Sequence, residues 1–338
     1  MGEFELLAKV WGRLPDAGPR LRLGAGDDAA VTVPGGATAT SVDALVEGVH
    51  FRRGQAGLAL VGRKALATAL SDLAAMGAEA GEAYVVLGAP PDLSEAECLE
   101  LVDGIATLAT ETGTAIAGGD LTRAPVLTLA VTVVGHAPRA EDFVGRGGAE
   151  PGDLLVLSGE IGGAAAGLAL LERPQLAAAV PAETAERLRQ RQLDPTPRLS
   201  TGQALARAGA TAMIDLSDGL GGDAGHLAAR SGVALRIDAG ALPLAKGVAE
   251  VAAAAGRDPL HLAASGGEDY ELLAALPAAR LAEASVAIGE AAETTLTPVG
   301  EVLAGAGVEI RLPGGGQVKA TGYDQLSPNA SAERRAAP

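Results

Sequence analysis

Carboxylates flanked by small residues are the side chains of this 338-residue sequence best suited to chemistry. Taken singly, each of them is also typical of a turn or a helix cap. They recur after glycine or serine in both halves of the chain, which indicates that both halves contribute to one acidic site. The members of this set are Asp27, Asp28, Asp43, Asp72, Asp120, Asp215, Asp218, Glu268 and Asp269.

Two of these carboxylates resist explanation as turn or cap residues. Asp72 lies inside a predicted helix, and no Lys or Arg stands three or four positions away to pair with it. Asp43 follows the apolar stretch of a predicted strand and precedes Ala44-Leu45-Val46. A carboxylate among apolar residues is costly to bury without a partner. Both residues are therefore predicted to find partners elsewhere in the fold.

Convergence of these groups would require cations. Two like charges about 4 Å apart repel by about 4 kcal/mol at an effective dielectric near 20. Oxygen ligands without His or Cys favour Mg²⁺ over zinc, and Mg²⁺ commonly bridges carboxylates to substrate phosphates. His136, His226 and His261 share no spacing typical of a metal site. The sequence therefore predicts several Mg²⁺ ions and a phosphorylated substrate.

Glycines near the acidic residues fit the same interpretation. The pairs Gly118-Gly119 and Gly266-Gly267 let the backbone approach a phosphate closely, although such pairs also form plain turns. The segment 159–163 either cradles phosphate at a helix N-terminus or provides close packing. A Gly-x-x-x-x-Gly-Lys-Ser/Thr stretch and the protein-kinase signatures are both missing from the sequence, which excludes those two nucleotide sites.

The composition predicts an aliphatic core, because hydrophobic residues make up 48% of the chain and aromatic residues only 2%. The cysteine content and the lack of a signal or membrane-spanning pattern, given below, predict a cytoplasmic protein. The net charge of −16 argues against nucleic acid and anionic membranes as partners. The N-terminus has no secretory signal pattern, and no apolar run approaches the ~20 residues that span a bilayer. The single cysteine, Cys98, excludes an intrachain disulfide.

Hydrophobic periodicity predicts the helices and strands that position the acidic residues. Ser94 and Glu97 form a capping-box signature, so Cys98 on the apolar face of the following helix is predicted to be a core residue rather than a nucleophile. The alternation predicts an α/β or α+β fold in two domains, with a linker near 145–152. Helices are predicted at 4–14, 58–76, 94–109, 164–171 and 186–194, and strands at 29–33, 37–42, 83–87, 114–117, 126–134 and 154–158.

Taken in order, five stretches resemble the thiamine-monophosphate kinase family. They are Gly-Asp-Asp-Ala at 26–29, Leu-Ser-Asp-Leu-Ala-Ala-Met-Gly-Ala at 70–78, Gly-Gly-Asp at 118–120, Asp-Leu-Ser-Asp-Gly-Leu at 215–220 and Ser-Gly-Gly-Glu-Asp-Tyr-Glu-Leu at 265–272. The resemblance covers nearly the whole chain, from Gly2 to Asp324. The wider superfamily includes aminoimidazole ribonucleotide synthetase and selenophosphate synthetase, which share an ATP-binding fold.

The resemblance implies an α/β (α+β) fold of two domains. The first, at 1–148, is expected to bind ATP and Mg²⁺ and to dimerise, and the second, at 149–326, is an α/β domain. A tail at 327–338 is predicted to be disordered. In the family, the N-terminal mixed sheets of two subunits pair into a barrel and ATP binds between the domains. A homodimer is therefore implied.

The implied reaction is the ATP-dependent phosphorylation of thiamine monophosphate to thiamine diphosphate, the last step of thiamine diphosphate biosynthesis. The phosphoryl group passes directly and in line, so no covalent or general-base residue is expected. The positions matching the family's magnesium ligands are Asp28, Ser41, Asp43, Asp72, Asp120, Asp215 and Asp218. The positions matching its ATP contacts are Gly119, Asp120, Arg146 and Ser217, and those assigned to the substrate are His50, Glu268 and Tyr323.

Two positions depart from the family pattern. Val42 stands where a Thr is common beside the metals. Ala320 stands where some members have an aromatic residue near the thiamine ring, so any stacking would depend on Tyr323.

Without the resemblance, blander interpretations stay open. Arg146 would be a solvated linker arginine, His50 a structural hydrogen bonder and Glu268 a turn residue. Two other functions also stay open: another enzyme of the same superfamily, and a non-catalytic protein that binds divalent cations. The second would bind Mg²⁺ and consume no ATP with any acceptor.

Overall fold

The computed structural model describes residues 3–15, 18–25, 29–292, 294–318 and 322–323. Its contacts divide the chain into two compact units. The first comprises Met1–Ala74 and Ala78–Phe143, and the second comprises Ala75–Gly77 and Val144–Pro338. The domain boundary predicted between 148 and 149 therefore stays a proposal, and the predicted tail at 327–338 lies outside the described residues.

The first unit is built on a mixed four-stranded sheet. Its strands are β3 (Ala37–Val46), β4 (Glu79–Ala89), β5 (Ala115–Arg123) and β6 (Thr128–Ala137), in the order β3-β6-β4-β5. β4 and β5 are parallel, whereas β6 is antiparallel to both β3 and β4. A separate ribbon pairs β1 (Leu21–Leu23) with β2 (Val31–Thr32). A mixed N-terminal sheet is what the family resemblance implies.

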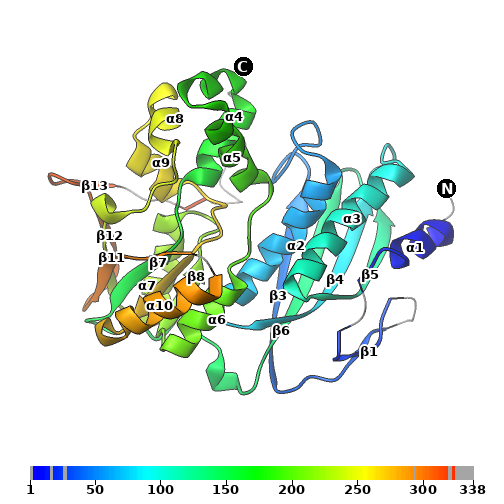
Figure 1. Ribbon diagram of the computed structural model, residues 1–338, viewed down its shortest axis with the longest axis horizontal. Helices are drawn as coiled ribbons and strands as arrows, with labels where there is room; N and C mark the ends of the chain where they lie inside the picture. Colours follow the sequence, from blue (N-terminus) through cyan, green and yellow to red (C-terminus); the bar gives the residue numbers. More distant parts are fainter. Residues whose placement is uncertain (1–2, 16–17, 26–28, 293, 319–321, 324–338) are drawn as a thin grey trace. The chain divides into compact units, whose positions relative to one another are not determined.

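Helices cover one face of this sheet. They are α1 (Glu3–Trp11), α2 (Leu58–Ala75) and α3 (Glu95–Thr112), and Figure 1 shows α2 and α3 side by side over the strands. The two helices approach closely at two glycines. A Cβ on Gly62 would lie 2.1 Å from the carbonyl oxygen of Leu101, and one on Gly104 would lie 1.9 Å from that of Ala59. Only glycine fits at this crossing.

The sheet of the first unit has one covered face and one open face. Along β3, side chains alternate between intermediate and exposed, as expected for a strand with period two. Leu45 on the covered face is 3% exposed, whereas Val42 on the other face is 65% exposed. Val86 of β4 is 41% exposed on the same open face. Large aliphatic side chains are thus left in contact with solvent.

The N-terminus of α3 confirms the predicted capping box. The Ser94 hydroxyl accepts from the Glu97 N–H, and the Glu97 carboxylate accepts from the Ser94 N–H. Cys98 follows in the first turn and is 2% exposed. Burial raises the pKa of the Cys98 thiol, which keeps it protonated and unreactive. Cys98 is therefore a core residue, as predicted.

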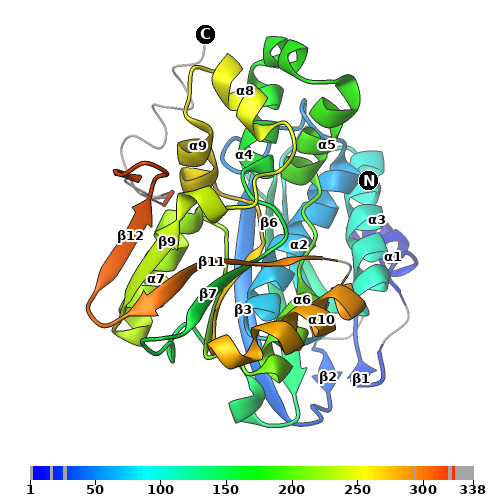
Figure 2. The same ribbon diagram turned by 60° about the vertical axis from the view of Figure 1, so that its left-hand side comes forward.

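The second unit contains a seven-stranded sheet in the order β13-β12-β9-β11-β7-β10-β8. Its pairs are antiparallel except for β9 and β12. Figure 2 shows β12, β9, β11 and β7 next to one another. The strands are β7 (Leu154–Ser158), β8 (Ala212–Asp215), β9 (Ala234–Asp238), β10 (Leu272–Leu276), β11 (Leu296–Leu303), β12 (Gly307–Arg311) and β13 (Gln317–Val318).

Two apolar clusters hold the helices of this unit. One cluster packs Leu227 of α7 (Leu220–Ser231) against Leu155 and Ile237 of the sheet. The other joins Leu170, Leu188 and neighbouring side chains, away from the strands. The helices are α4 (Gly163–Glu172), α5 (Ala182–Leu193), α6 (Leu199–Ala208), α7 (Leu220–Ser231), α8 (Val248–Ala254), α9 (Pro259–Ser265) and α10 (Leu281–Ala292). Within the described ranges, no helix combines the length and apolar character needed to cross a membrane.

Several strands extend beyond their predicted ends, and β5 is among them. The prediction ended a strand at Ala117, just before Gly118-Gly119-Asp120, whereas β5 continues through all three residues to Arg123. β4 supplies a parallel partner for each of these residues, so backbone pairing outweighs the low strand propensity of glycine. Gly119 is also fixed by space, because a Cβ there would lie 2.0 Å from the Val85 carbonyl oxygen.

Candidate functional site

A strand and a helix bring Ser41 and Asp72 together in the first unit. The Ser41 hydroxyl on β3 donates a hydrogen bond of 2.5 Å to the Asp72 carboxylate in the interior of α2. Asp43 stands two residues after Ser41 and therefore projects from the same, helix-covered face of β3. Ser41 of the adjacent strand is thus a partner of Asp72, as the sequence analysis predicted that Asp72 would have. Ser41, Asp43 and Asp72 place oxygen atoms on the helix-covered side of β3.

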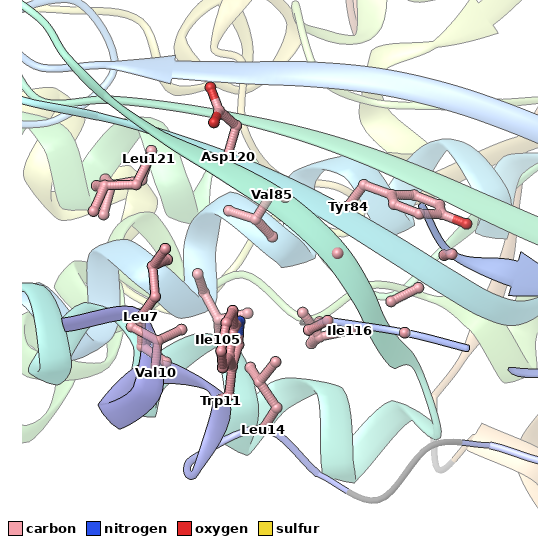
Figure 3. Close-up of a pocket in the computed structure, with 18 of the residues that line it drawn as sticks. Leu7, Val10, Trp11, Leu14, Tyr84, Val85, Ile105, Ile116, Asp120 and Leu121 are labelled. Atoms are coloured by element: carbon pink, nitrogen blue, oxygen red, sulfur yellow. The ribbon is translucent and has the colours of Figure 1, made fainter. Parts of the chain in front are cut away.

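Asp120 lies on the opposite face of that sheet. Across the strands, Asp43 pairs with Val131 and Val131 with Val85, whereas Asp120 pairs with Val86, the next residue of β4. Successive residues of a strand point to opposite faces. Figure 3 shows the Asp120 carboxylate and the Val85 side chain on opposite sides of the strands. The structure therefore does not bring Asp120 together with Asp43. Asp28 lies outside the described residues.

The turn after β3 fixes the imidazole of His50. The Val46 N–H donates to His50 Nδ1 at 3.0 Å, so Nδ1 is an acceptor and the ring proton of the neutral form sits on Nε2. Gly48, with φ of +82°, allows the tight turn, and its N–H donates to the Phe51 carbonyl at 2.8 Å. His50 is therefore held as a donor through Nε2, which suits an anionic oxygen of a ligand.

In the second unit, two of the recognised motifs are joined by backbone hydrogen bonds. The Leu216 N–H donates to the Glu271 carbonyl at 2.8 Å, and the Tyr270 N–H donates back to the Leu216 carbonyl at 2.9 Å. The Glu268 N–H donates to the Ser217 carbonyl at 2.8 Å. This pairing places Ser217 next to Glu268, although they are far apart in the sequence.

The close approach of these two segments depends on glycine. A Cβ on Gly267 would lie 2.4 Å from the Ser217 carbonyl oxygen. Gly219, with φ of +110°, would place a Cβ 2.9 Å from the Ser265 carbonyl oxygen. Any larger residue at either position would push the motifs apart. Gly267, one member of a pair predicted to approach a phosphate, thus allows close contact between two protein segments.

The C-terminal part of the described chain joins the same site. The Tyr323 N–H donates to the Asp218 carbonyl at 3.0 Å. A Cβ on Gly222 would lie 2.5 Å from the Gly322 Cα, so a second glycine contact holds this segment down. Tyr323 and Asp218 are thus brought together as neighbours in this unit. Ala320, the departure near the expected thiamine ring, lies outside the described residues.

Asp223 is a site residue that the sequence interpretation missed. It lies in the first turn of α7, is 2% exposed, and accepts from the N–H groups of Asp218 and Gly219 at 3.1 and 3.0 Å. Burial, followed by the charges of Asp215 and Asp218, raises the pKa of Asp223 to about 8. The run Asp-Gly-Leu-Gly-Gly-Asp at 218–223, with a second Asp shortly after a glycine pair, is the signal that could have identified it.

The described side chains offer oxygen atoms for Mg²⁺ but no complete protein cage. Among the residues that the structure describes, no three or more His, Cys, Asp or Glu side chains form a group that could hold a metal. Mg²⁺ usually binds through one or two carboxylates together with water and substrate phosphates, rather than through a complete protein cage. The side-chain oxygens of Ser41 and Asp72 in the first unit, and those of Asp215 and Asp218 in the second, suit coordination of this shared kind.

A carboxylate occupies the glycine-rich segment 159–163. Asp269 accepts from the Gly162 N–H through Oδ2 at 2.7 Å and from the Ala164 N–H through Oδ1 at 3.0 Å. These are N-terminal amides of α4, the groups that would otherwise bind a phosphate. Of the two alternatives for this segment, the structure therefore supports close packing within the protein. Burial raises the pKa of Asp269 to about 7.

The raised pKa predicts a pH dependence of stability that Asp269→Asn removes. Between the ordinary pKa of 3.8 and about 7, the folded protein retains a proton that the unfolded chain has released. The free energy of unfolding of the wild type therefore falls as pH rises through this window, by at most about 1.4 kcal/mol per pH unit. Urea unfolding at pH 5, 6, 7 and 8 should show the variant gaining on the wild type up to pH 7. A constant difference would contradict the prediction.

Ser231 fixes the backbone around Arg146. The Ser231 hydroxyl, at the C-terminus of α7, donates to the Arg146 carbonyl at 3.0 Å and accepts from the Gly148 and Ala149 N–H groups at 3.2 Å each. The Met213 N–H donates to the Gly145 carbonyl at 2.9 Å. Arg146 itself is exposed. The predicted linker is therefore anchored to α7 and β8, with an arginine projecting from it.

A cavity of about 800 Å³ lies beside the Gly-Gly-Asp motif of the first unit. Apolar side chains of α1, α3 and β5 form most of its wall, and Figure 3 shows Trp11, Ile105 and Ile116 gathered on one side of the strands. Gly119 and Asp120 are also among the residues that line it. A cavity of this size and character suits a small molecule with an apolar, flat part.

Comparisons with known proteins extend over both units. Residues 26–137 match the family model described as "AIR synthase related protein, N-terminal domain", and residues 150–313 match that of its C-terminal domain. A curated thiamine-monophosphate kinase from Mycobacterium tuberculosis is 40% identical over 277 residues, which cover 81% of this chain and 80% of the relative.

Solved structures agree with these sequence matches. The crystal structure of thiamine-monophosphate kinase from Stenotrophomonas maltophilia aligns with a TM-score of 0.80 at 37% identity, covering 92% of this chain and 96% of that one. A structure described as AaThiL complexed with AMPPCP and TMP aligns with a TM-score of 0.76 at 31% identity, covering 96% and 97%.

Proposed function

We propose, because the chain belongs to the thiamine-monophosphate kinase family of AIR synthase related proteins, that it transfers the γ-phosphoryl group of ATP to thiamine monophosphate. The products are ADP and thiamine diphosphate. The observation that carries this proposal within the structure is the backbone pairing of Glu268 with Ser217, since it joins a residue assigned to the acceptor with one assigned to ATP.

The chemistry needs little beyond positioning and charge neutralisation. The nucleophile is a phosphate oxygen of thiamine phosphate, which is largely ionised at neutral pH because its second pKa is about 6. A new O–P bond forms to the γ-phosphorus as the bond to the β-phosphate oxygen breaks, so a general base is unnecessary. When bound, Mg²⁺ neutralises the charge that develops on the transferred group.

The chain's own groups have separate roles in this reaction. In the first unit, Ser41, Asp43 and Asp72 offer hard oxygen donors from one face of the sheet. In the second unit, Asp215 at the end of β8 and Asp218 just before α7 do the same. These assignments to Mg²⁺, and that of Asp120, remain proposals.

Polar groups orient the two substrates. We assign the exposed Arg146 guanidinium, a planar fork of donors, and Ser217 to the phosphates of ATP. His50, through Nε2, is assigned to an oxygen of the acceptor. Glu268 either complements the thiazolium cation or accepts from the aminopyrimidine, and Tyr323 lies close enough to Asp218 to contribute to the same site.

The cavity beside Gly119 and Asp120 is proposed to hold the adenine of ATP. Its aliphatic wall offers contact to a flat aromatic ring, and it lies next to Gly119 and Asp120, which are assigned to ATP. Filling the cavity should therefore weaken the binding of ATP and leave the binding of thiamine phosphate unchanged. Ile116→Trp is expected to raise the KM for ATP about tenfold or more and to leave the KM for thiamine phosphate within about twofold.

Steady-state kinetics with each substrate varied in turn check the Ile116→Trp prediction. Ile116→Val keeps the cavity open and serves as the matched control, with both KM values near those of the wild type. Equal increases in both KM values for Ile116→Trp would indicate a general disturbance and contradict the assignment of adenine to this cavity.

A homodimer is proposed to form through the open face of the first unit's sheet. Val42 and Val86 leave apolar surface exposed there, and β3 is an edge strand of ten residues. Natural proteins usually cover such edges and such faces. A second copy of the chain is the occupant that the family's paired sheets imply.

The function is tested by ATP consumption with a panel of acceptors. Wild-type protein with Mg²⁺ should convert thiamine phosphate to thiamine diphosphate and should leave free thiamine unchanged. Phosphorylation of free thiamine but not of its monophosphate would overturn the substrate assignment. Mg²⁺ binding without ATP consumption under any acceptor would instead favour a non-catalytic cation-binding protein.

A further inference from the structure

The segment Glu268–Glu271 has an unusual backbone. Glu268 has φ of +67° and Tyr270 has φ of +50°, and they are the only non-glycine residues with positive φ in the part of the chain that the structure describes. The left-handed region is unfavourable for residues with a Cβ, and such strain persists only where surrounding contacts impose it. Something must therefore hold this segment in place.

Three side chains tether the segment to three different elements. Gln192 of α5 donates to the Glu268 carboxylate. Asp269 binds the N-terminal amides of α4, as described above. Glu271, which is fully buried, accepts two hydrogen bonds from Arg198. The carboxylates at 268, 269 and 271 thus point into separate parts of the unit, and only the first has been assigned to a ligand.

The Glu271 tether continues into the sheet. Ser158, at the end of β7, donates to Glu271 Oε2 at 2.6 Å, and the same hydroxyl accepts from the Leu272 N–H at 2.8 Å. Arg198 is 23% exposed at its side chain, so the ion pair closes the buried end of the segment against solvent. A charge-assisted, two-point bond of this kind fixes orientation as well as distance.

We propose that Asp269 and Glu271 are positioning residues for the acceptor: by anchoring the backbone on both sides of Tyr270 to α4 and to Arg198, they hold Glu268 in the strained conformation that presents it to thiamine phosphate. The inference rests on the proposed function, because it assumes that Glu268 contacts the acceptor. Neither Asp269 nor Glu271 touches a substrate in this scheme.

The ATP side of the site has its own anchor. Asp223 binds the N–H groups of Asp218 and Gly219, which fixes the segment that carries Ser217 independently of Asp269. Loss of the Asp269 tether should therefore affect the two substrates unequally. This difference separates a positioning role from a general structural one.

Asp269→Asn tests the proposal, because its NH₂ group cannot accept the second amide hydrogen bond. The variant is expected to raise the KM for thiamine phosphate about tenfold, with the KM for ATP within about twofold of the wild type. The affinity for thiamine phosphate, measured by calorimetry, should fall by a similar factor. That measurement needs no turnover, so the inference can fail or succeed separately from the proposed activity.

Arg198→Lys is the second variant and decides the matter if Asp269→Asn fails to fold. It keeps a positive charge near the buried Glu271 but loses the two-point bond. We expect the affinity for thiamine phosphate to fall about threefold and the affinity for ATP to stay unchanged. Arg236→Lys, which alters the ion pair with Glu301 on β9 and β11 of the same unit, is the matched control and should change neither.

Unchanged affinity for thiamine phosphate in Asp269→Asn, or in Arg198→Lys where the first does not fold, would overturn the proposal. So would equal losses for ATP and thiamine phosphate, because they would indicate a role in folding alone. Failure of the wild type to bind thiamine phosphate would overturn both this inference and the substrate assignment. Binding without turnover would leave the inference standing and remove only the proposed activity.

Discussion

Asp72→Asn is expected to reduce turnover of ATP and thiamine phosphate by about 1,000-fold or more while the protein stays folded. Removing one preorganised electrostatic contact to a transferring group commonly costs about 100- to 1,000-fold in kcat. A ligand that shares a cation with phosphate oxygens should lie at or above the upper end of this range. The Mg²⁺ dependence should shift to higher concentrations at the same time.

The structure explains why the fold should survive this change. The Asp72 carboxylate projects from α2 toward β3, and its Oδ2 accepts from the Ser41 hydroxyl. An asparagine oxygen can accept the same hydrogen bond, and the side-chain volume is nearly unchanged. The surrounding helix is anchored by Leu66, Leu70 and Leu73, each at most 1% exposed. The substitution therefore removes a charge and little else.

Turnover at saturating Mg²⁺, together with the thermal midpoint of unfolding, is the measurement for Asp72→Asn. Asp92→Asn is the matched control, because Asp92 is an exposed residue of the same unit and its ion pair with Arg53 lies at the surface. The control should retain wild-type turnover. Near-normal activity of Asp72→Asn at saturating Mg²⁺ would contradict its assignment to a metal.

Local rules account for much of what the sequence predicted correctly. The capping box at Ser94, the helix around Asp72 and the buried Cys98 all follow from side-chain chemistry within one or two turns. Such short-range preferences act in the same way before and after folding. The need of Asp72 for a partner was also visible, since no Lys or Arg stands three or four positions away on its helix.

Long-range pairing decided the features that the sequence left undetermined. Gly118 and Gly119 are poor strand formers, yet β4 draws them into β5 and turns Asp120 to the open face. The amides after Gly159 were candidates for phosphate until Asp269, more than a hundred residues away, proved to accept from them. No local pattern specifies which distant carboxylate will reach a helix N-terminus.

The burial of Asp223 is another feature that depends on long-range packing. Its position after the Gly221-Gly222 pair was visible in the sequence, but its burial beside Asp215 and Asp218 depends on how α7 packs against β8. The predicted convergence of acidic residues from both halves of the chain stays a prediction, as do the individual Mg²⁺ ligands. Residues within one unit are the ones whose juxtaposition the structure establishes.

Val42→Glu is expected to convert a homodimer into a monomer. Val42 is 65% exposed at the middle of β3, on the face that none of the described helices of the first unit covers, and β3 is an edge strand of the sheet as far as it is described. In a symmetric dimer the same patch meets itself, so each interface would contain the substitution twice. Two carboxylates in an apolar contact would each lose hydration without gaining a partner.

Light scattering coupled to size exclusion provides the measurement. The wild type should have a mass of twice 33.4 kDa, and Val42→Glu should have 33.4 kDa with an unchanged circular dichroism spectrum. Val286→Glu is the matched control, because Val286 is 61% exposed on α10 of the second unit and should leave the mass unchanged. A wild-type monomer, or a dimer that persists in Val42→Glu, would mean that this open face has another occupant. The apolar exposure of β3 would then need a partner other than a second copy of the chain.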